Sequence, residues 1–107
     1  MNLKNQLLGK KVIVTGASRG LGESICYTLA ESGAEIAMIS RSKDEMEKIR
    51  KKIINSNEHI SIKLDLSSIS KISYAIMKAK KFLKNIDIVL HIAGGGLGLK
   101  DPLLNYK

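Results

Sequence analysis

The chain has 107 residues, of which 44% are hydrophobic and 26% charged, and its formal net charge is +8. This length fits one domain, and the composition excludes a disordered chain and a collagen-like repeat. No apolar run approaches the roughly 18 residues that cross a bilayer, and the first residues lack a signal peptide's apolar core. A single cysteine, Cys26, forms no internal disulfide. We therefore expect a cytoplasmic protein with no membrane partner.

Most of the positive charge lies in the middle of the chain. Residues 43–84 contain eleven basic and five acidic side chains, so +6 of the +8 lies there. The chain has one Phe, three Tyr and no Trp, which leaves few aromatic side chains for base stacking. We interpret the charge as solvated lysines on helix faces and expect no nucleic-acid partner.

Short apolar runs alternate with amphipathic segments in the first half of the chain. Residues 11–15 and 35–39 are compact apolar runs, which predict two buried strands. The segment between them ends on Ser32-Gly33, a typical end for a helix. Its apolar residues recur at helical spacing: Leu21, Ile25 and Leu29. Ser42 followed by Glu45 forms a capping box, which predicts the start of a second helix. The apolar stripe of that helix is Met46, Ile49 and Ile53.

The second half of the chain continues the same alternation. Residues 59–66 predict a third strand, although we expect His59 itself to be a surface residue. Ser67 or Ser68 is expected to cap a third helix. The predicted apolar stripe of this helix is Ile69, Ile72, Ile76, Ala79 and Leu83. Residues 86–93 form a fourth apolar run, which predicts a strand flanked on both sides.

The predicted element order is β-α-β-α-β-α-β. It favours an α/β fold, a Rossmann-type doubly wound parallel sheet with helices on both faces. Right-handed crossovers that reverse direction after the third strand give the strand order 3-2-1-4. We expect residues 1–107 to form a single domain whose sheet is incomplete beyond the fourth strand, because an apolar edge strand is normally covered.

A glycine-rich turn, Thr15-Gly16-Ala17-Ser18-Arg19-Gly20-Leu21-Gly22, joins the first strand to the first helix. Glycines let the backbone turn tightly and approach a ligand, and a helix N-terminus offers free N–H groups to phosphate. The spacing differs from the G-x-G-x-x-G fingerprint, and no Gly-Lys-Ser/Thr follows as in a P-loop. Its position within a βαβ unit indicates a nucleotide site.

The sequence resembles the short-chain dehydrogenase/reductase family over essentially its whole length. TGASRGLG matches that family's TGxxxGxG cofactor motif, and Gly9-Lys10-Lys11 and Gly33-Ala34 are also similar to members of the family. The resemblance implies an NAD(P)-binding domain. Its implied pyrophosphate contacts are Gly16, Gly20, Leu21 and Gly22, with Ser18 beside them.

The end of the second strand bears on which nicotinamide cofactor is preferred. NAD-binding folds place a carboxylate there, whereas this chain has Ser40 followed by Arg41. A guanidinium binds a 2′-phosphate through two parallel hydrogen bonds, and a serine does not repel it. Arg19 is a second cation where NADP-preferring members resemble this chain. We therefore expect NADP rather than NAD.

Two further positions follow from the resemblance. Asp65-Leu66 is similar to the family's segment that meets the adenine ring. Ala93-Gly94 is similar to the end of its NNAG motif, where small residues pass close to the cofactor. The two asparagines of that motif are replaced by His91 and Ile92. We interpret His91 as a structural substitute and not as a catalytic base.

The family uses a Tyr-x-x-x-Lys pair and an upstream Ser for hydride-transfer chemistry. The chain contains this spacing at Tyr74 and Lys78, but on the helix before the fourth strand, whereas the family's pair lies well after it. We therefore predict no catalytic residue within the 107 residues. Likewise, no Cys/His cluster with metal-ligand spacing is present in the sequence.

The leading hypothesis is the N-terminal part of an NADP-dependent oxidoreductase that transfers a hydride between NADP(H) and a carbonyl or alcohol. The resemblance implies a small-molecule substrate and a homo-oligomer at full length, with the 107-residue chain inactive by itself. The alternative is a naturally short, non-catalytic nucleotide-binding module that associates with a partner across the open edge of the fourth strand.

Overall fold

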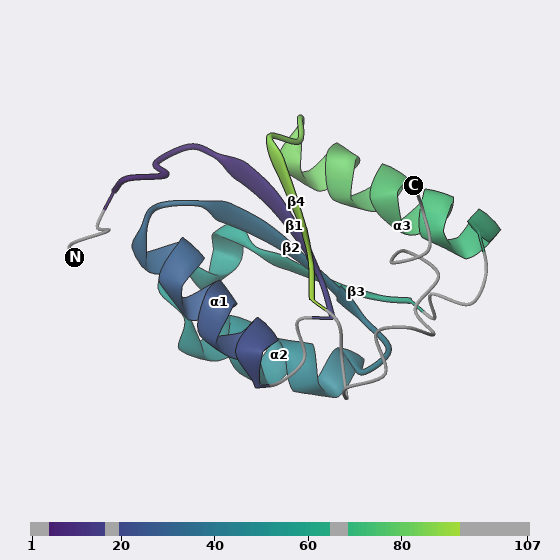
Figure 1. Cartoon of the computed structure of the whole chain (residues 1–107), viewed down its shortest axis with the longest axis horizontal. Helices are drawn as coiled ribbons and strands as arrows, with labels where there is room; N and C mark the ends of the chain where they lie inside the picture. The colour runs from purple at the N-terminus through teal and green to yellow at the C-terminus, as the bar shows by residue number, and fades with distance from the viewer. Residues whose placement is uncertain (1–4, 17–19, 65–68, 93–107) are drawn as a thin grey trace.

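The computed structural model describes residues 5–16, 20–64 and 69–92. Within them, the strands are β1 (Lys11–Thr15), β2 (Glu35–Ser40), β3 (Ile60–Lys63) and β4 (Ile88–His91). The helices are α1 (Leu21–Glu31), α2 (Lys43–Lys52) and α3 (Ile69–Leu83), with a short 3-10 helix over Ser56–Glu58. All neighbouring strands run parallel, in the order β3-β2-β1-β4 (Figure 1). The predicted α/β, Rossmann-type fold and its strand order are confirmed.

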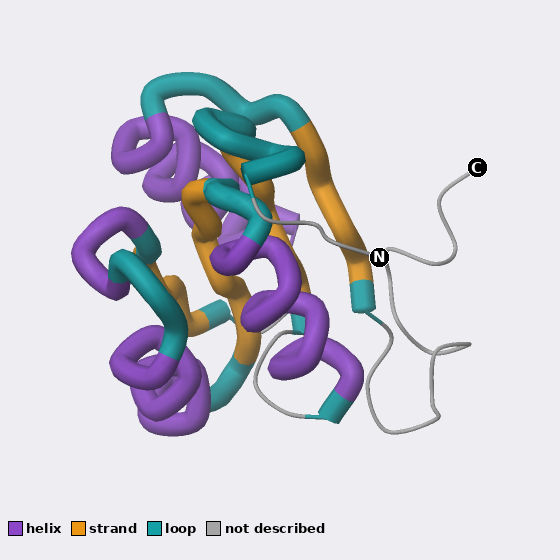
Figure 2. The backbone as a smooth tube through the Cα atoms, turned by 90° about the vertical axis from the view of Figure 1, so that its left-hand side faces the viewer, coloured by secondary structure: helices purple, strands orange, loops and turns teal. Residues whose placement is uncertain are grey.

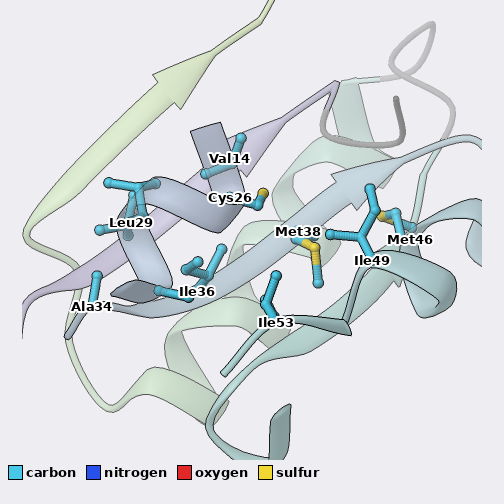
Figure 3. Close-up of a cluster of buried hydrophobic side chains, with 11 residues drawn as sticks. Val14, Cys26, Leu29, Ala34, Ile36, Met38, Met46, Ile49 and Ile53 are labelled. Carbon is cyan, nitrogen blue, oxygen red and sulfur yellow. The ribbon is translucent and has the colours of Figure 1, made fainter. Parts of the chain in front are cut away.

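The two faces of the sheet are covered by different helices, because successive side chains of each strand point to opposite faces. Figures 1 and 2 show α1 and α2 on one side of the strands and α3 on the other. Apolar residues of β1 and β2 that face α1 and α2 form the larger core cluster, part of which is drawn in Figure 3: Val12, Val14, Ile36 and Met38. Ile13, Ala37 and Ile39 point the other way, toward Ala75, Ala79 and Leu83 of α3.

Local sequence signals place the ends of α1 and α2 where they were predicted. Ser32 is the C-terminal cap of α1, and Gly33 follows with φ +94°, a conformation that glycine adopts without steric cost. The Ser42 hydroxyl accepts a hydrogen bond from the backbone N–H of Glu45 at 3.3 Å and caps α2. The stripe predicted for α2 is buried at all three positions, Met46, Ile49 and Ile53.

The stripe predicted for α3 is partly wrong. Ile69 is 70% exposed, and the buried line consists of Ala75, Ala79 and Leu83, with Ile72 and Ile76 packed beside it. Ala79 and Leu83 are buried as predicted, whereas Ala75 was not predicted; the small side chains of Ala75 and Ala79 let the helix lie close to the sheet. The predicted caps Ser67 and Ser68 lie outside the described residues.

Both of the last two strands are shorter than predicted, and the expectation about His59 is wrong. His59, expected on the surface, precedes β3 and is only 4% exposed. The fourth apolar run was interpreted as a normally flanked strand in a sheet that is incomplete in this chain; among the described residues β1 is the only partner strand of β4, and Val89 is 57% exposed. None of the described helices combines the length and the apolar character needed to cross a bilayer.

Candidate functional site

The candidate site lies where the carboxyl ends of β1, β2 and β4 meet. Backbone hydrogen bonds join the three ends: the Gly16 N–H donates to the Ile39 carbonyl at 2.7 Å, and the Ile92 N–H donates to the Thr15 carbonyl at 2.9 Å. In open parallel sheets, ligands bind in the crevice beyond these ends. The strand order places the reversal of direction between β1 and β4, so this edge is the expected ligand position.

Gly16 has two structural reasons to be a glycine. Its φ is +76°, in the left-handed region that side chains rarely adopt. A Cβ built on it would also overlap the carbonyl oxygen of Ile92. Gly16 therefore lies against the end of β4 with no room for a side chain.

The N-terminus of α1 is the second part of the site. Gly20 is the N-cap residue, with φ +60° and ψ −127°, and it has no side chain that could accept from the first-turn N–H groups. Such amides have no acceptor within the helix and carry the positive end of its dipole, so they are suited to an anionic group. Leu21 is exposed at this end, whereas Gly22 is buried.

The end of β2 presents Arg41 on a turn that is ordered by two serines. The buried Ser40 accepts a hydrogen bond through its hydroxyl from the Ser42 N–H at 3.1 Å, and Ser42 in turn caps α2. Arg41 lies exposed between them, and no carboxylate of the described residues forms an ion pair with it. The arrangement leaves Arg41 exposed at the carboxyl end of β2.

Thr15 and His91 form a side-chain contact that sequence patterns did not reveal. They are register partners at the ends of β1 and β4, and Thr15 Oγ1 lies 2.5 Å from His91 Nδ1. The signal was present in the sequence, since each residue lies at the end of an apolar run that precedes glycines. To predict the contact, the register between β1 and β4 would have been needed, because the two residues are 76 positions apart in the sequence.

Two buried titratable groups lie away from this edge. Burial raises the pKa of the Cys26 thiol to about 12, and the nearby charge of Glu23 acts in the same direction. Burial lowers the pKa of His59, which lies before β3. Neither group is suited to acid–base chemistry at the site. Across residues 5–16, 20–64 and 69–92, no cluster of three His, Cys, Asp or Glu side chains is placed to hold a metal ion.

The described part of the chain places half of the predicted site residues. These residues lie at the end of β1, on the first turn of α1 and at the end of β2: Gly16, Gly20, Leu21, Gly22, Ser40 and Arg41. The other predicted residues lie outside the described ranges: Ser18, Arg19, Asp65, Leu66, Ala93 and Gly94. The fit to a dinucleotide therefore rests on the close approach of Gly16 to Ile92, the N-terminus of α1 at Gly20 and the serine turn that carries Arg41.

A family model and a similar enzyme of known name agree on the family to which the chain is similar. The short chain dehydrogenase family model matches residues 10–105. Glucose 1-dehydrogenase of Gluconobacter oxydans is 32% identical over 93 residues, which are 85% of this chain and 35% of that enzyme. The chain thus spans about a third of that relative's length.

Two solved structures show the likeness in three dimensions. An alcohol dehydrogenase from the archaeon Thermococcus sibiricus, complexed with 5-hydroxy-NADP, is 33% identical with a TM-score of 0.70. The match covers 75% of this chain and 35% of that one. A 3-ketoacyl-(acyl-carrier-protein) reductase from Brucella melitensis, complexed with NADH, is 26% identical with a TM-score of 0.72 and coverages of 78% and 33%. These similar structures thus hold NADH in one case and an NADP derivative in the other.

Proposed function

The chain belongs to the short-chain dehydrogenase family, and we propose that it forms the cofactor-binding portion of an NADP-dependent oxidoreductase. The observation that carries the proposal is the glycine turn: Gly16 lies directly against the Ile92 carbonyl, and four residues later α1 begins at Gly20, an N-cap residue without a side chain. This combination suits a pyrophosphate, which needs close backbone approach and free N–H donors. The similar structures with bound 5-hydroxy-NADP and NADH support it.

The preference for NADP over NAD rests on the end of β2. A carboxylate at this position would accept from the ribose hydroxyls of NAD and repel a 2′-phosphate. Ser40 carries no charge, and its hydroxyl is already engaged with the Ser42 N–H. Arg41 is exposed beside it and forms no ion pair within the described residues, so its guanidinium is available for a bidentate phosphate contact.

The proposed reaction is hydride transfer between the nicotinamide ring, which supplies or accepts the hydride when bound, and a small-molecule carbonyl or alcohol. The residues of this chain would bind and orient the dinucleotide: Gly16, Gly20 and Gly22 at the pyrophosphate, and Ser40 and Arg41 at the adenosine ribose. Tyr74, the aromatic member of the only Tyr-x-x-x-Lys spacing, is 60% exposed on α3, where Lys78 Nζ lies 5.6 Å from its ring centroid. We propose that this pair has no catalytic role and that the 107-residue chain binds cofactor without turnover.

A titration of the purified chain with NADP⁺ and, separately, NAD⁺ tests the proposal by isothermal calorimetry. We expect saturable binding of both, tighter for NADP⁺, and no oxidation of NADPH in the presence of a panel of aldehydes and ketones. Equal or tighter binding of NAD⁺ would contradict the cofactor preference. Turnover of NADPH by the chain would contradict its proposed inactivity, and absence of binding to either cofactor would contradict the site.

A second candidate function is a non-catalytic nucleotide-binding module that associates with a partner along β4. The specific observation is that no strand of the described residues pairs with the outer edge of β4 and that Val89 of this strand is exposed. The same chain would then work in the cytoplasm with a protein partner and without nucleic acid or membrane. Sedimentation velocity at several concentrations separates the candidates, because a monomer at all concentrations excludes self-association through β4.

A further inference from the structure

β4 is attached to β1 by side chains at both of its ends. At the amino end, Asp87 accepts a hydrogen bond from the Lys11 N–H through Oδ2 at 2.8 Å, and its own N–H donates to the Lys11 carbonyl at 2.8 Å. At the carboxyl end, Thr15 Oγ1 and His91 Nδ1 are 2.5 Å apart. Because the described chain pairs β4 on one side only, these two attachments supplement a single ladder of backbone bonds.

The carboxyl-end attachment is contiguous with the glycine turn. The Thr15 carbonyl accepts from the Ile92 N–H, and the next residue, Gly16, lies directly against the Ile92 carbonyl. Thr15 is buried, and the Gly16 N–H is held by the Ile39 carbonyl of β2. Thr15, Gly16, His91 and Ile92 thus form one hydrogen-bonded and packed unit, and the amino-end attachment at Asp87 lies at the other end of the strand.

Gly16 has no side chain with which to fix its own position. Its φ of +76° is open to glycine, but glycine also has the widest choice of other conformations. The position of the turn is therefore set by its neighbours, and the end of β4 is one of the two surfaces against which it lies. A small displacement of that strand end would move Ile92 relative to Gly16. It would thereby change the backbone surface that a phosphate must approach.

We propose that His91 is a positioning residue: its hydrogen bond with Thr15 holds the end of β4 against β1 and so fixes the glycine turn in its nucleotide-binding form. The inference rests on the proposed function for the identity of the ligand. The effect of His91 on the conformation of the turn does not depend on the proposed function. It assigns His91, which stands where the family has an asparagine, a role through Thr15 and no contact with the reacting atoms.

The first test needs no ligand and uses amide hydrogen exchange. Thr15→Val keeps the shape of the side chain and removes the hydroxyl, whereas Thr15→Ser keeps the hydroxyl. We expect Thr15→Val to speed exchange of the Gly16 and Ile92 amides by about fivefold to tenfold, the loss of one hydrogen bond, and Thr15→Ser to restore protection. Asp87→Ala is the matched control, because it loosens β4 at the amino end and should leave the Gly16 amide protected.

Equal protection of Gly16 in wild type and Thr15→Val would overturn the proposal. So would an equal loss of protection in Asp87→Ala, since the effect would then reflect general loosening of the strand and not positioning of the turn. A double-mutant cycle that combines Thr15→Val with His91→Leu completes the exchange experiment. The double variant should exchange no faster than the more affected single variant, and simple additivity would contradict action through the Thr15 bond.

The second test measures affinity for NADP⁺ in the same variants. We expect the dissociation constant to rise about fivefold to tenfold in Thr15→Val and His91→Leu and to stay within about twofold of wild type in Thr15→Ser and Asp87→Ala. In the wild-type chain the side-chain ¹⁵N signals of its two histidines give a built-in comparison. Addition of NADP⁺ should shift the ¹⁵N signal of the His91 side chain and leave the ¹⁵N signal of the His59 side chain unchanged.

The outcomes separate the inference from the proposed function. If wild-type chain binds NADP⁺ and Thr15→Val binds it equally well, the positioning role is wrong and the proposed function stands. If wild-type chain binds no nucleotide while exchange at Gly16 still depends on the Thr15 hydroxyl, the proposed function is wrong and the control of the turn by His91 stands.

Discussion

The backbone N–H of Ile36 donates a hydrogen bond to Nδ1 of His59 at 3.1 Å, and Nε2 of the same ring lies 2.9 Å from the Ile54 carbonyl. A backbone N–H needs an acceptor, so Nδ1 is unprotonated and Nε2 carries the proton that is donated to Ile54. The ring is thus a neutral imidazole that bridges β2 to the segment after α2. This bridge lies near the beginning of β2, at the opposite edge of the sheet from Gly16.

Stability should fall on the acid side because of this histidine. Burial lowers the pKa of His59 below its ordinary value of 6.5, so the unfolded state binds its proton more readily than the folded state. The stabilising contribution is therefore complete above about pH 6.5 and is lost as the pH falls through the lower, folded-state pKa. Urea denaturation between pH 5 and pH 8 should show the unfolding free energy decreasing toward pH 5.

His59→Gln gives the matched comparison for this pH dependence. A glutamine side chain offers an acceptor oxygen and a donor NH₂ group, which can replace the acceptor and donor nitrogens of the neutral ring, and it does not titrate. The variant should have a flatter profile between pH 5 and pH 7, whereas His91→Gln should retain the slope that His59 causes. An unchanged slope in His59→Gln would exclude His59 as the origin of the acid sensitivity.

The Cys26 thiol should be unreactive in the folded chain. It is fully buried in the cluster between α1 and the sheet (Figure 3), and burial raises its pKa to about 12, so almost no thiolate exists near neutral pH. Ellman's reagent at pH 8 should modify it only as fast as the protein unfolds, and rapidly in 6 M urea on the order of seconds to minutes. Rapid labelling without denaturant would show that α1 opens locally.

A polar side chain at position 26 should lower the free energy of unfolding. Cys26→Ser places a hydroxyl among apolar side chains, and we expect a loss of about 1–3 kcal/mol of unfolding free energy. Cys26→Ala is the control, since it removes volume without adding a polar group. A serine variant as stable as the alanine variant would show that the hydroxyl finds a partner in this cluster.

Much of the fold was predictable because local and global signals agree along the first half of the chain. The β-branched run Lys11–Thr15 ends at a glycine, and it forms β1 with the predicted bounds. Ser32-Gly33 ends α1, and Ser42 caps α2 by accepting a hydrogen bond from the backbone of its first turn. These boundaries therefore follow from local chemistry. The strand order follows from the handedness of the crossovers.

The errors share a physical cause, namely contacts between segments distant in sequence. The helical spacing of apolar residues placed Ile69 in the predicted stripe of α3, whereas Ala75 is buried against the sheet in its place. His59 was expected on the surface, but two backbone groups satisfy both of its ring nitrogens, so the ring is buried. The contact between Thr15 and His91 depends on strand register, which no local pattern gives. Of the site, the glycines and Arg41 were accessible from the sequence and this contact was not.

Gly16 should be the least replaceable glycine among those described with positive φ. Gly16→Ala places a Cβ into the Ile92 carbonyl and also strains a φ of +76°. Gly9→Ala is the matched control, since its φ is +80° and nothing lies within 4 Å of the added Cβ. Gly9→Ala should cost about 1–2 kcal/mol for the left-handed conformation, and Gly16→Ala at least about 2 kcal/mol more.

Thermal and urea unfolding of the two glycine variants check this difference. Gly16→Ala should also abolish measurable NADP⁺ binding in whatever fraction remains folded, whereas Gly9→Ala should bind as wild type does. Equal stability of the two variants would mean that the end of β4 moves aside easily, and the packed contact between Gly16 and Ile92 would then have little energetic weight.

Arg41 should decide which cofactor binds more tightly. Arg41→Asp replaces the guanidinium at the end of β2 by a carboxylate, which repels a 2′-phosphate and accepts from ribose hydroxyls. Affinity for NADP⁺ should fall by at least about tenfold, the loss of one charge-assisted contact, while affinity for NAD⁺ changes little or rises. The ratio of the two dissociation constants, measured by calorimetry on the same protein batch, is the relevant quantity because it cancels any general loss of folded protein.

Arg50 provides the control for this substitution. Its guanidinium binds both carboxylate oxygens of Glu47, each at 2.9 Å, and accordingly holds the pKa of Glu47 at about 2. It therefore has a partner within α2, whereas Arg41 has none among the described residues. Arg50→Ala should reduce stability slightly and leave the NADP⁺ to NAD⁺ ratio unchanged. If Arg41→Asp also left that ratio unchanged, the 2′-phosphate would have to be recognised elsewhere, and Arg19 would be the next residue to replace.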